Sequence, residues 1–232
     1  MKSSPLAPAP SDVTNANVPA RERVYEYVSR EILLGHFAGG SFVEEEQIST
    51  AMSVSRTPVR EAFHRLEAER FIDLLPRRGA LVRQVTAQEL GDLYETRRLI
   101  EGYSIARICQ SKLAIPVEMA NLLKRMVQLR NSESHVEHVI LDWSFHRALV
   151  TAGGNEVLAE AFDSLRSKQL RVATAALALD PKRIGRILDE HRELLAALVK
   201  HDETTARQVL EKHFQPAADV VSRLPGFSIR DV

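Results

Sequence analysis

The chain has 232 residues, of which 44% are hydrophobic and 27% are charged, and its formal net charge is zero. These values are typical of a soluble globular protein, and no segment has the roughly 20 consecutive apolar residues that a membrane span needs. The single cysteine, Cys109, excludes an internal disulfide and fits a reducing cytoplasm. Zero net charge excludes a surface that is basic all over, but it leaves room for a local basic patch that binds nucleic acid.

The chain changes character near residue 86. Residues 1–19 are rich in Pro, Ser, Ala and Asn and lack the apolar core of a secretory signal, so we expect a disordered arm there. Short segments broken by glycine and proline follow over 20–86, whereas 87–224 has long helical periods and 225–232 is a short tail. The sequence therefore predicts a mainly α protein with two folded domains.

The first domain is expected to be a winged helix-turn-helix. Its predicted elements are helices at 21–36, 45–52 and 56–69, then strands at 72–75 and 80–83. Ser53 and Val54 form the turn between the second and third helices, and Ser55 can cap the third. The segment Pro76-Arg77-Arg78-Gly79 joins the two strands and forms the tip of a wing.

The third helix of this domain has two different faces. The inward face carries Val59, Ala62, Phe63 and Leu66, and the outward flank carries Arg56, Arg60 and His64. Guanidinium groups read guanine bidentately and a helix N-terminus favours phosphate, so this flank suits the major groove of DNA. Over 54–83 seven arginines stand against four acids, a net charge of +3 (7 − 4). An ordinary solvated helix is the alternative, and the basic wing favours DNA over it.

The second domain is expected to be an antiparallel bundle of six helices. These helices are predicted at roughly 87–112, 116–131, 135–152, 155–178, 181–200 and 203–222. Thr86 and Glu89 have the spacing of a capping box at the start of the first helix.

Three of these helices each place a histidine in an apolar stripe. His146 follows Asp142 by four residues, so both point inward from one helical face, and His191 and His213 lie on two further helices. A lone histidine in such a stripe is more often a hydrogen-bonded core residue than a ligand. Four polar residues buried together instead favour a shared cation, and imidazole with carboxylate suits zinc, nickel, iron(II) or manganese. The other histidines, His138 among them, are placed in loops, at helix ends or on polar faces and are given no role.

Arg97 lies on the inward stripe of the first long helix, where a buried guanidinium needs a carboxylate partner. Glu101, one turn further on, is the internal candidate, and a carboxylate ligand is the external one. The residues alone slightly favour the internal partner.

A resemblance to a known family strengthens the first-domain interpretation. The runs that carry it are Ser55-Arg56-Thr57-Pro58-Val59-Arg60-Glu61-Ala62, Leu66-Glu67-Ala68-Glu69 and Arg77-Arg78-Gly79-Ala80, which resemble the winged helix-turn-helix of GntR-family bacterial transcription regulators. The resemblance implies that Ser55, Arg56, Thr57 and Arg60 bind DNA, together with a minor-groove wing of Arg77, Arg78 and Gly79. Ser53 stands where the family usually has the turn glycine, so a left-handed backbone is expected there, and Glu46 stands where some members carry a DNA-contacting arginine.

The second domain is similar to the effector-binding FCD domain of FadR-type regulators, in the branch of the vanillate regulators. The resemblance is carried by Tyr94-Glu95-Thr96-Arg97, Asp142, Phe145-His146, Gly154-Asn155, Glu190-His191 and His213. It implies one divalent transition metal per chain, zinc before nickel, manganese or iron, held by Asp142, His146, His191 and His213. It also implies a small carboxylate effector at Arg97, Glu101 and Asn155, and a cytoplasmic homodimer that binds a short inverted repeat of operator DNA.

Two other functions stay open at this point. Three histidines and an aspartate could activate water in a metal-dependent hydrolase, which would also need a general base such as Glu101. The metal could also be purely structural. Because no further buried acid or histidine has a suitable phase, we expect a regulator and not an enzyme.

Overall fold

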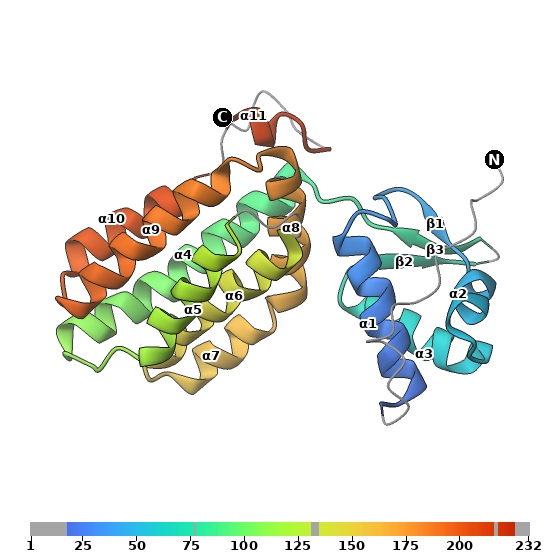
Figure 1. Cartoon of the computed structure of the whole chain (residues 1–232), viewed down its shortest axis with the longest axis horizontal. Coiled ribbons are helices and arrows are strands. Elements are labelled where there is room, and N and C mark those ends of the chain that lie inside the picture. Colours follow the sequence, from blue (N-terminus) through green and yellow to red (C-terminus); the bar gives the residue numbers. More distant parts are fainter. Residues whose placement is uncertain (1–17, 77, 131–134, 216–217, 226–232) are drawn as a thin grey trace. The chain divides into compact units, whose positions relative to one another are not determined.

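In the computed structural model, the described residues are 18–76, 78–130, 135–215 and 218–225. The expected arm, except for Val18 and Pro19, lies outside them, as do Arg77 and the tail beyond Pro225. The chain divides into two compact units, Met1–Gln84 and Val85–Val232. Each unit has its own elements (Figure 1).

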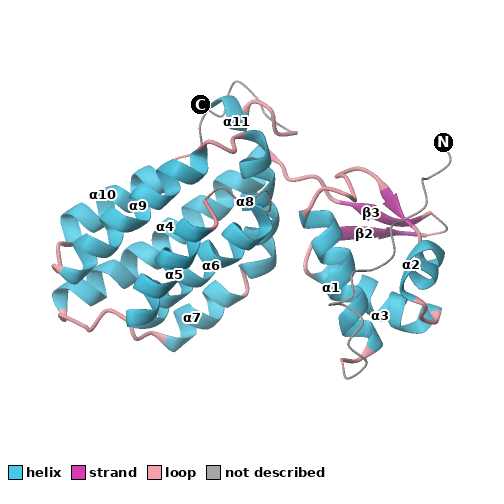
Figure 2. Cartoon of the chain, in the orientation of Figure 1, coloured by secondary structure: helices cyan, strands magenta, loops and turns pink. Residues whose placement is uncertain are grey.

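The first unit combines three helices with a small antiparallel sheet, as expected for a winged helix-turn-helix (Figure 2). Its elements are α1 (Ala20–Leu33), β1 (Phe42–Val43), α2 (Glu45–Met52), α3 (Arg56–Ala68), β2 (Ile72–Leu75) and β3 (Gly79–Val82). The sheet order is β1-β3-β2, with Ile72 opposite Val82 and Val43 opposite Ala80. Strand β1 was not expected, because two residues carry no periodic pattern and only pairing with β3 defines them.

The inward face predicted for α3 is confirmed. Val59, Phe63 and Leu66 are at most 1% exposed and share one core with Val24 and Val28 of α1. This packing fixes the orientation of α3, so the opposite flank of the helix is the one that faces solvent.

Two backbone positions in this unit need an unusual conformation. Ser53 ends α2 in the left-handed region, at φ 52° and ψ 45°, as expected where related sequences have glycine. Gly79 begins β3 at φ +89°, and a Cβ there would lie 3.1 Å from the carbonyl oxygen of Val43. Only glycine therefore fits the end of the wing without strain.

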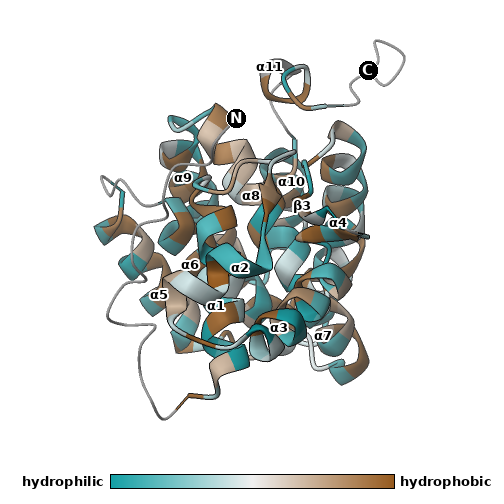
Figure 3. Cartoon of the chain, turned by 90° about the vertical axis from the view of Figure 1, so that its right-hand side faces the viewer, coloured by the Kyte–Doolittle hydropathy of each residue, from teal (hydrophilic) through white to brown (hydrophobic). Residues whose placement is uncertain are grey.

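The second unit consists of helices in the part of the chain that the structure describes. They are α4 (Ala87–Gln110), α5 (Val117–Gln128), α6 (His135–Ala152), α7 (Glu156–Asp163), α8 (Arg166–Leu179), α9 (Arg183–Val199), α10 (Glu203–His213) and α11 (Ala218–Val221). Helix α6 packs against α4, α5, α7 and α8, and buried residues lie on nearly all of its faces. Hydrophobic and hydrophilic residues are mixed along the helices in Figure 3. Because α6 is central, Asp142 and His146, which it carries, are buried away from bulk water.

Two of the six expected helices occur in two pieces. The helix expected over 155–178 is divided into α7 and α8, because the Ser164 hydroxyl donates to the Ala161 carbonyl and the Leu165 amide bonds tightly to Phe162. The helix expected over 203–222 ends at His213. Arg183 of α9 donates to the carbonyls of His213 and Gln215, which satisfies acceptors that a continuing helix would have used. His213 is thus the last residue of α10 and not a mid-helix residue.

The start of α4 matches its prediction in part. The Thr86 hydroxyl accepts a hydrogen bond from the Glu89 amide at 3.1 Å, as in a capping box. The Glu89 carboxylate does not return to Thr86, because it is paired with Arg171 of α8. No helix among the described residues is long and apolar enough to cross a membrane.

Candidate functional site

The exposed flank of α3 carries the residues predicted to read DNA. Ser55, Arg56, Thr57 and Arg60 are all exposed, and the side chains of Arg56 and Arg60 are 58% and 62% exposed. Ser55 occupies the N-cap position as expected, but its side chain makes no capping bond within the described residues, so the hydroxyl is free for another acceptor. The helix therefore presents two guanidinium groups near its N-terminus, where the helix dipole favours an anion.

Two acidic side chains of α2 neutralise these arginines. Glu45 accepts from Arg60 Nε at 2.8 Å, and Glu46 accepts from Arg56 Nη2 at 3.1 Å. All four side chains are at least one third exposed, so the pairs are screened and weak. Each glutamate therefore competes with DNA for the arginine that it contacts.

Replacing both Glu45 and Glu46 by glutamine is expected to strengthen DNA binding. Exposed ion pairs contribute about 0.2–1 kcal/mol each, so the double variant should gain roughly 2- to 30-fold in affinity for each copy bound to the duplex. Fluorescence anisotropy on a duplex that the unmodified protein selects from a random library measures this change. The double substitution Glu26→Gln and Glu160→Gln, at two exposed glutamates outside α2 and α3, removes the same charge and serves as control. Equal gains in both proteins would mean that net charge, and not release of the two arginines, is responsible.

The wing carries a further arginine, Arg78, which lies beside strand β1 of the sheet. The Arg78 guanidinium lies 5.2 Å from the centre of the exposed Phe42 ring on β1, a cation–π contact that holds the side chain in place. Arg77, the other arginine predicted for the tip, is outside the described residues.

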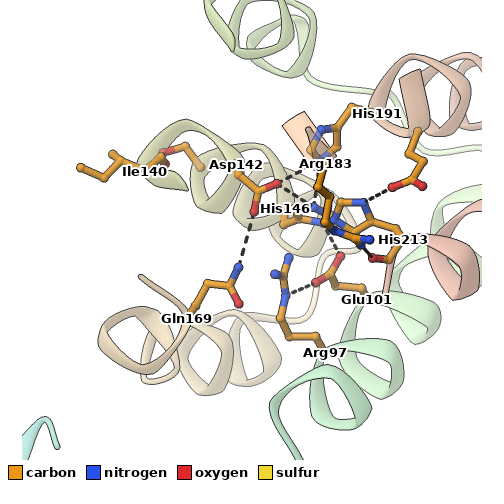
Figure 4. A network of polar contacts seen from close by, with 11 residues as sticks. Arg97, Glu101, Ile140, Asp142, His146, Gln169, Arg183, His191 and His213 are labelled. Atoms are coloured by element: carbon orange, nitrogen blue, oxygen red, sulfur yellow. Dashed lines mark hydrogen bonds and ion pairs between the residues drawn. The ribbon is translucent and has the colours of Figure 1, made fainter. Parts of the chain in front are cut away.

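In the second unit, the four predicted metal ligands converge. Asp142 and His146 come from α6, His191 comes from α9 and His213 ends α10, and the potential ligand atoms all lie within 4.8 Å of one another (Figure 4). His191 Nε2 is 3.0 Å from His146 Nε2 and 3.4 Å from Asp142 Oδ1. All four residues are buried.

Two buried carboxylates orient these histidines from outside the cluster. Glu101 of α4 accepts from Nδ1 of His146 at 2.5 Å, and Glu190 of α9 accepts from Nδ1 of His213 at 2.9 Å. With the proton held on Nδ1, Nε2 of His146 keeps its lone pair and faces Nε2 of His191. Carboxylates that hold the far nitrogen of a histidine in this way are typical partners of metal ligands.

Burial and mutual charge set the ionisation of the cluster. Burial lowers the pKa of both His191 and His213 and so favours their neutral, ligating form. Burial alone would raise the pKa of Asp142, but positive charge on His146, His191 and Arg97 outweighs it and holds that pKa far below its usual range. Asp142 is therefore ionised at neutral pH, and burial favours the neutral form of His191 and His213.

The donor set fits a divalent transition metal. Ligand distances of about 2.1 Å place neighbouring ligand atoms roughly 3.0–3.5 Å apart. His191 Nε2 lies 3.0 Å from His146 Nε2 and 3.4 Å from Asp142 Oδ1, and His146 Nε2 lies 3.7 Å from Asp142 Oδ1. Without a metal, His191 Nε2 can donate to His146 Nε2, but the buried Nδ1 of His191 has no partner among the described residues. A cation held between the two Nε2 atoms would let His191 carry its proton on Nδ1 instead.

Arg97 lies next to the cluster, as predicted, and is 1% exposed. Its Nε donates to Glu101 Oε1 at 2.8 Å, so the internal partner that the sequence favoured is present. The guanidinium lies 4.5 Å from the centre of the Phe214 ring, and its Nη2 has no hydrogen-bond partner among the described residues. Glu101 therefore neutralises the Nε side of the Arg97 guanidinium, while its Nη2 can still donate to a ligand.

Arg97 and the cluster border a common cavity of about 30 Å³. Its wall includes Asp142 and His213 from the metal cluster, and it also includes Gln169 of α8 and Arg183 of α9 (Figure 4). A cavity of this volume holds one or two water molecules. A small organic ligand beside both the cluster and Arg97 would therefore need the lining side chains to move apart.

The structure corrects two expectations about this pocket. Asn155, predicted to contact the effector, does not line it; its side chain accepts from the Leu158 amide and caps α7. His138, placed on a polar face and given no role, is 1% exposed and lines the pocket. Its position four residues before Asp142 was a usable signal, because that spacing places both on one helical face.

Glu101 does not suit the role of a general base. Both of its oxygens are occupied, one by Arg97 and one by His146, and these two partners lower its pKa in spite of its burial. A hydrolase would need a carboxylate free to take a proton from water. The observation weighs against the hydrolase alternative.

An exposed helix with two arginines, a wing, and a separate helical unit together define a winged-helix transcription regulator that binds DNA. Residues 20–82 match the gntR family of bacterial regulatory proteins, and residues 92–216 match the FCD domain. The chain belongs to the GntR family and carries an FCD domain.

Relatives agree with this assignment. The Nta operon transcriptional regulator of Aminobacter aminovorans is 31% identical over 80% of this chain and 89% of its own. The gluconate operon transcriptional repressor of Bacillus subtilis is 26% identical over 87% of this chain and 85% of its own. A GntR regulator structure from Rhodococcus sp. RHA1 is similar at a TM-score of 0.74, with 25% identity over 88% of this chain and 98% of that one. These relatives are named as a transcriptional regulator and a transcriptional repressor, and the family of this chain is one of regulators, as the sequence indicated.

Proposed function

We propose that this protein is a repressor whose DNA binding responds to a small carboxylate held beside a divalent transition metal. The observation that carries the proposal is the convergence of Asp142, His146, His191 and His213 next to the open side of Arg97, at one pocket. A metal bound by these four residues and the guanidinium of Arg97 would together attract an anionic ligand.

The metal would be held by those four side chains, with zinc preferred and nickel, manganese or iron(II) as alternatives. When bound, it supplies a positive charge that attracts an oxygen of the carboxylate. Glu101 and Glu190 keep the proton of their histidines on Nδ1, and the low pKa of Asp142 keeps this residue ionised.

Arg97 is the residue proposed to orient the ligand. Its Nε is fixed by Glu101 and its plane lies near Phe214, so the open Nη2 is held in place before a ligand arrives. A preorganised donor loses little conformational entropy on binding. A carboxylate oxygen is the natural acceptor for this atom.

The effect of ligand binding in the pocket would be transmitted to the first unit through α4. This helix carries Arg97 and Glu101 and begins at Ala87, three residues after the first unit ends at Gln84. A ligand that shifts α4 against α6 would change the connection to the DNA-reading unit. A coupling of about 1–3 kcal/mol would alter operator affinity roughly 5- to 150-fold.

We also propose that two copies act together in the cytoplasm on a short inverted repeat. Two copies related by a twofold axis would place two α3 helices in successive major grooves. Analytical ultracentrifugation of the protein with and without a selected duplex tests this assembly.

Replacing His191 by alanine is expected to remove most of the bound metal and, with it, the response to acids. Loss of one of four ligands should reduce the affinity for metal at least 10- to 100-fold, the range seen even for changes outside the ligand shell. Native mass spectrometry and elemental analysis of protein purified without chelator measure the metal content per chain. Acid-induced release from DNA is measured on the same samples.

The matched control is His36→Ala, which removes an exposed histidine of the first unit. It should retain the metal content of the unmodified protein. If the His191 variant also keeps one metal per chain, the proposed ligand set is incorrect. If it loses the metal but still responds to acids, the metal is structural only.

A further inference from the structure

Helix α4 exposes two large apolar side chains to solvent. Leu99 is 70% exposed and Tyr103 is 44% exposed, and because they are four residues apart they are neighbours on one face of the helix. The half-buried Ile100 and Ala106 border them and extend the apolar patch. Helix α4 packs against α6, α8 and α10, so this patch points away from the core of the second unit. A single exposed apolar residue is common on protein surfaces, whereas a contiguous patch favours an interaction surface.

Opposite charges flank this patch at equal distances. Glu95 precedes Leu99 by four residues and Arg107 follows Tyr103 by four residues, so the four side chains form a single ridge along the helix. Both charged residues are exposed, and neither forms an ion pair with another described residue. The patch therefore has a free negative charge at one end and a free positive charge at the other.

A ridge with this order of residues is complementary to a second copy of itself. In an antiparallel pairing that places Leu99 of one copy opposite Tyr103 of the other, Glu95 lies opposite Arg107. A twofold axis repeats each of these contacts, so both the apolar contact and the ion pair occur twice. Ridges of residues four apart also pack well against each other, at a crossing angle of about 50°. A parallel pairing would instead place like charges opposite each other.

We propose that the face of α4 that carries Leu99 and Tyr103 binds the same face of a second copy of this chain in antiparallel orientation. This inference rests on the proposed function, since it assigns the surface through which two copies act together on DNA. The buried side of the same helix carries Arg97 and Glu101. A ligand that shifts α4 would therefore also change the contact between the two copies.

Sedimentation velocity of the full-length protein, with and without the selected duplex, tests the apolar part of this surface. Leu99→Glu places two charges in the centre of the pairing and should weaken self-association about 100-fold or more. The control is Val117→Glu, which introduces the same charge at a residue of α5 that is 76% exposed, and it should associate like the unmodified protein. Circular dichroism checks that both variants are folded.

The outcomes of this experiment separate the inference from the proposed function. If Leu99→Glu associates as tightly as the unmodified protein, the assigned surface is wrong, while pairing of two copies still holds. If Leu99→Glu lowers the thermal stability of the protein without changing its association, another part of the same chain covers the face and the assignment is also wrong. If the unmodified protein is monomeric both free and on the duplex, the proposed pairing fails and this inference fails with it.

Exchange of the flanking charges tests the antiparallel orientation. Glu95→Arg and Arg107→Glu each place like charges opposite each other when a variant pairs with itself, so each should weaken self-association about 10-fold or more. In a mixture of the two variants, every flanking contact again joins opposite charges, and native mass spectrometry should show mostly mixed pairs. Single variants that associate as tightly as the unmodified protein, or a mixture without recovery, would overturn the antiparallel pairing.

Discussion

Replacing Arg60 by alanine is expected to abolish sequence-specific DNA binding and to leave both units folded. The Arg60 side chain is 62% exposed and contacts Glu45 of α2, so its removal costs the core nothing. A bidentate arginine–guanine contact contributes about 1–3 kcal/mol of discrimination. On an inverted repeat bound by two copies the loss doubles, to about 2–6 kcal/mol, which corresponds to roughly 30-fold to more than 10,000-fold weaker binding.

Arg60→Lys is the informative companion variant. Lysine keeps the positive charge but lacks the planar fork that reads two guanine atoms at once. If Arg60 reads a base, the lysine variant should lose nearly as much specific affinity as the alanine variant. If it contacts a phosphate, lysine should restore most of the binding.

Anisotropy titrations on the selected duplex and on a scrambled duplex, at two salt concentrations, distinguish these results. Loss of a base contact lowers affinity for the selected duplex alone, whereas loss of a phosphate contact lowers both and reduces the salt dependence. Arg21→Ala, which removes an exposed arginine of α1, is the control for general charge. Unchanged binding by Arg60→Ala at moderate salt would show that α3 is not the reading helix.

Most of the DNA-reading unit could be predicted from sequence, because its signals are local. The inward stripe on α3 depends only on helical spacing, whereas the left-handed conformation of Ser53 was expected from the resemblance, which places a turn glycine at that position. The pairs of Glu45 with Arg60 and of Glu46 with Arg56 could not be predicted, because they depend on how α2 crosses α3. The sequence therefore predicted the exposed flank that we expect to read DNA, but not the two acids that pair with its arginines.

The residues of the metal cluster could be predicted because they are polar residues in otherwise apolar helical stripes. Asp142 and His146 are linked by their spacing on one helix, and His191 and His213 each stand out as a polar residue in an apolar stripe. The pocket wall was predicted less well. Gln169 and Arg183 reach it only because α8 and α9 pack beside α6, and no pattern within either helix specifies that arrangement.

Replacing Glu101 by alanine is expected to cause the largest loss of stability of any single change discussed for the second unit. Glu101 is completely buried and serves two partners, with Arg97 at 2.8 Å and His146 at 2.5 Å. Its removal leaves the Arg97 cation buried without a counter-charge, and breaking a buried pair in this way costs about 3–5 kcal/mol. Urea denaturation of metal-free protein, followed by circular dichroism, measures the change in the free energy of unfolding.

The exposed pair of Glu203 and Arg207 provides a matched comparison. It has the same four-residue spacing and the same 2.8 Å separation between Nε and Oε1, but both side chains lie at the surface. Glu203→Ala should therefore cost much less than Glu101→Ala, because water replaces the lost partner. Similar losses for the two variants would mean that the buried pair contributes no more than a surface pair.

The double variant Arg97→Met, Glu101→Met separates the cost of an unpaired charge from the cost of a lost contact. Replacing both charges by apolar side chains of similar length removes the unpaired cation, and such replacements are often neutral or stabilising. Recovery should be incomplete here, because Nδ1 of His146 still loses its acceptor. The double variant should accordingly be more stable than Glu101→Ala, yet bind metal more weakly and show no response to acids. A double variant that regained stability and still responded to acids would exclude Arg97 as the residue that holds the ligand.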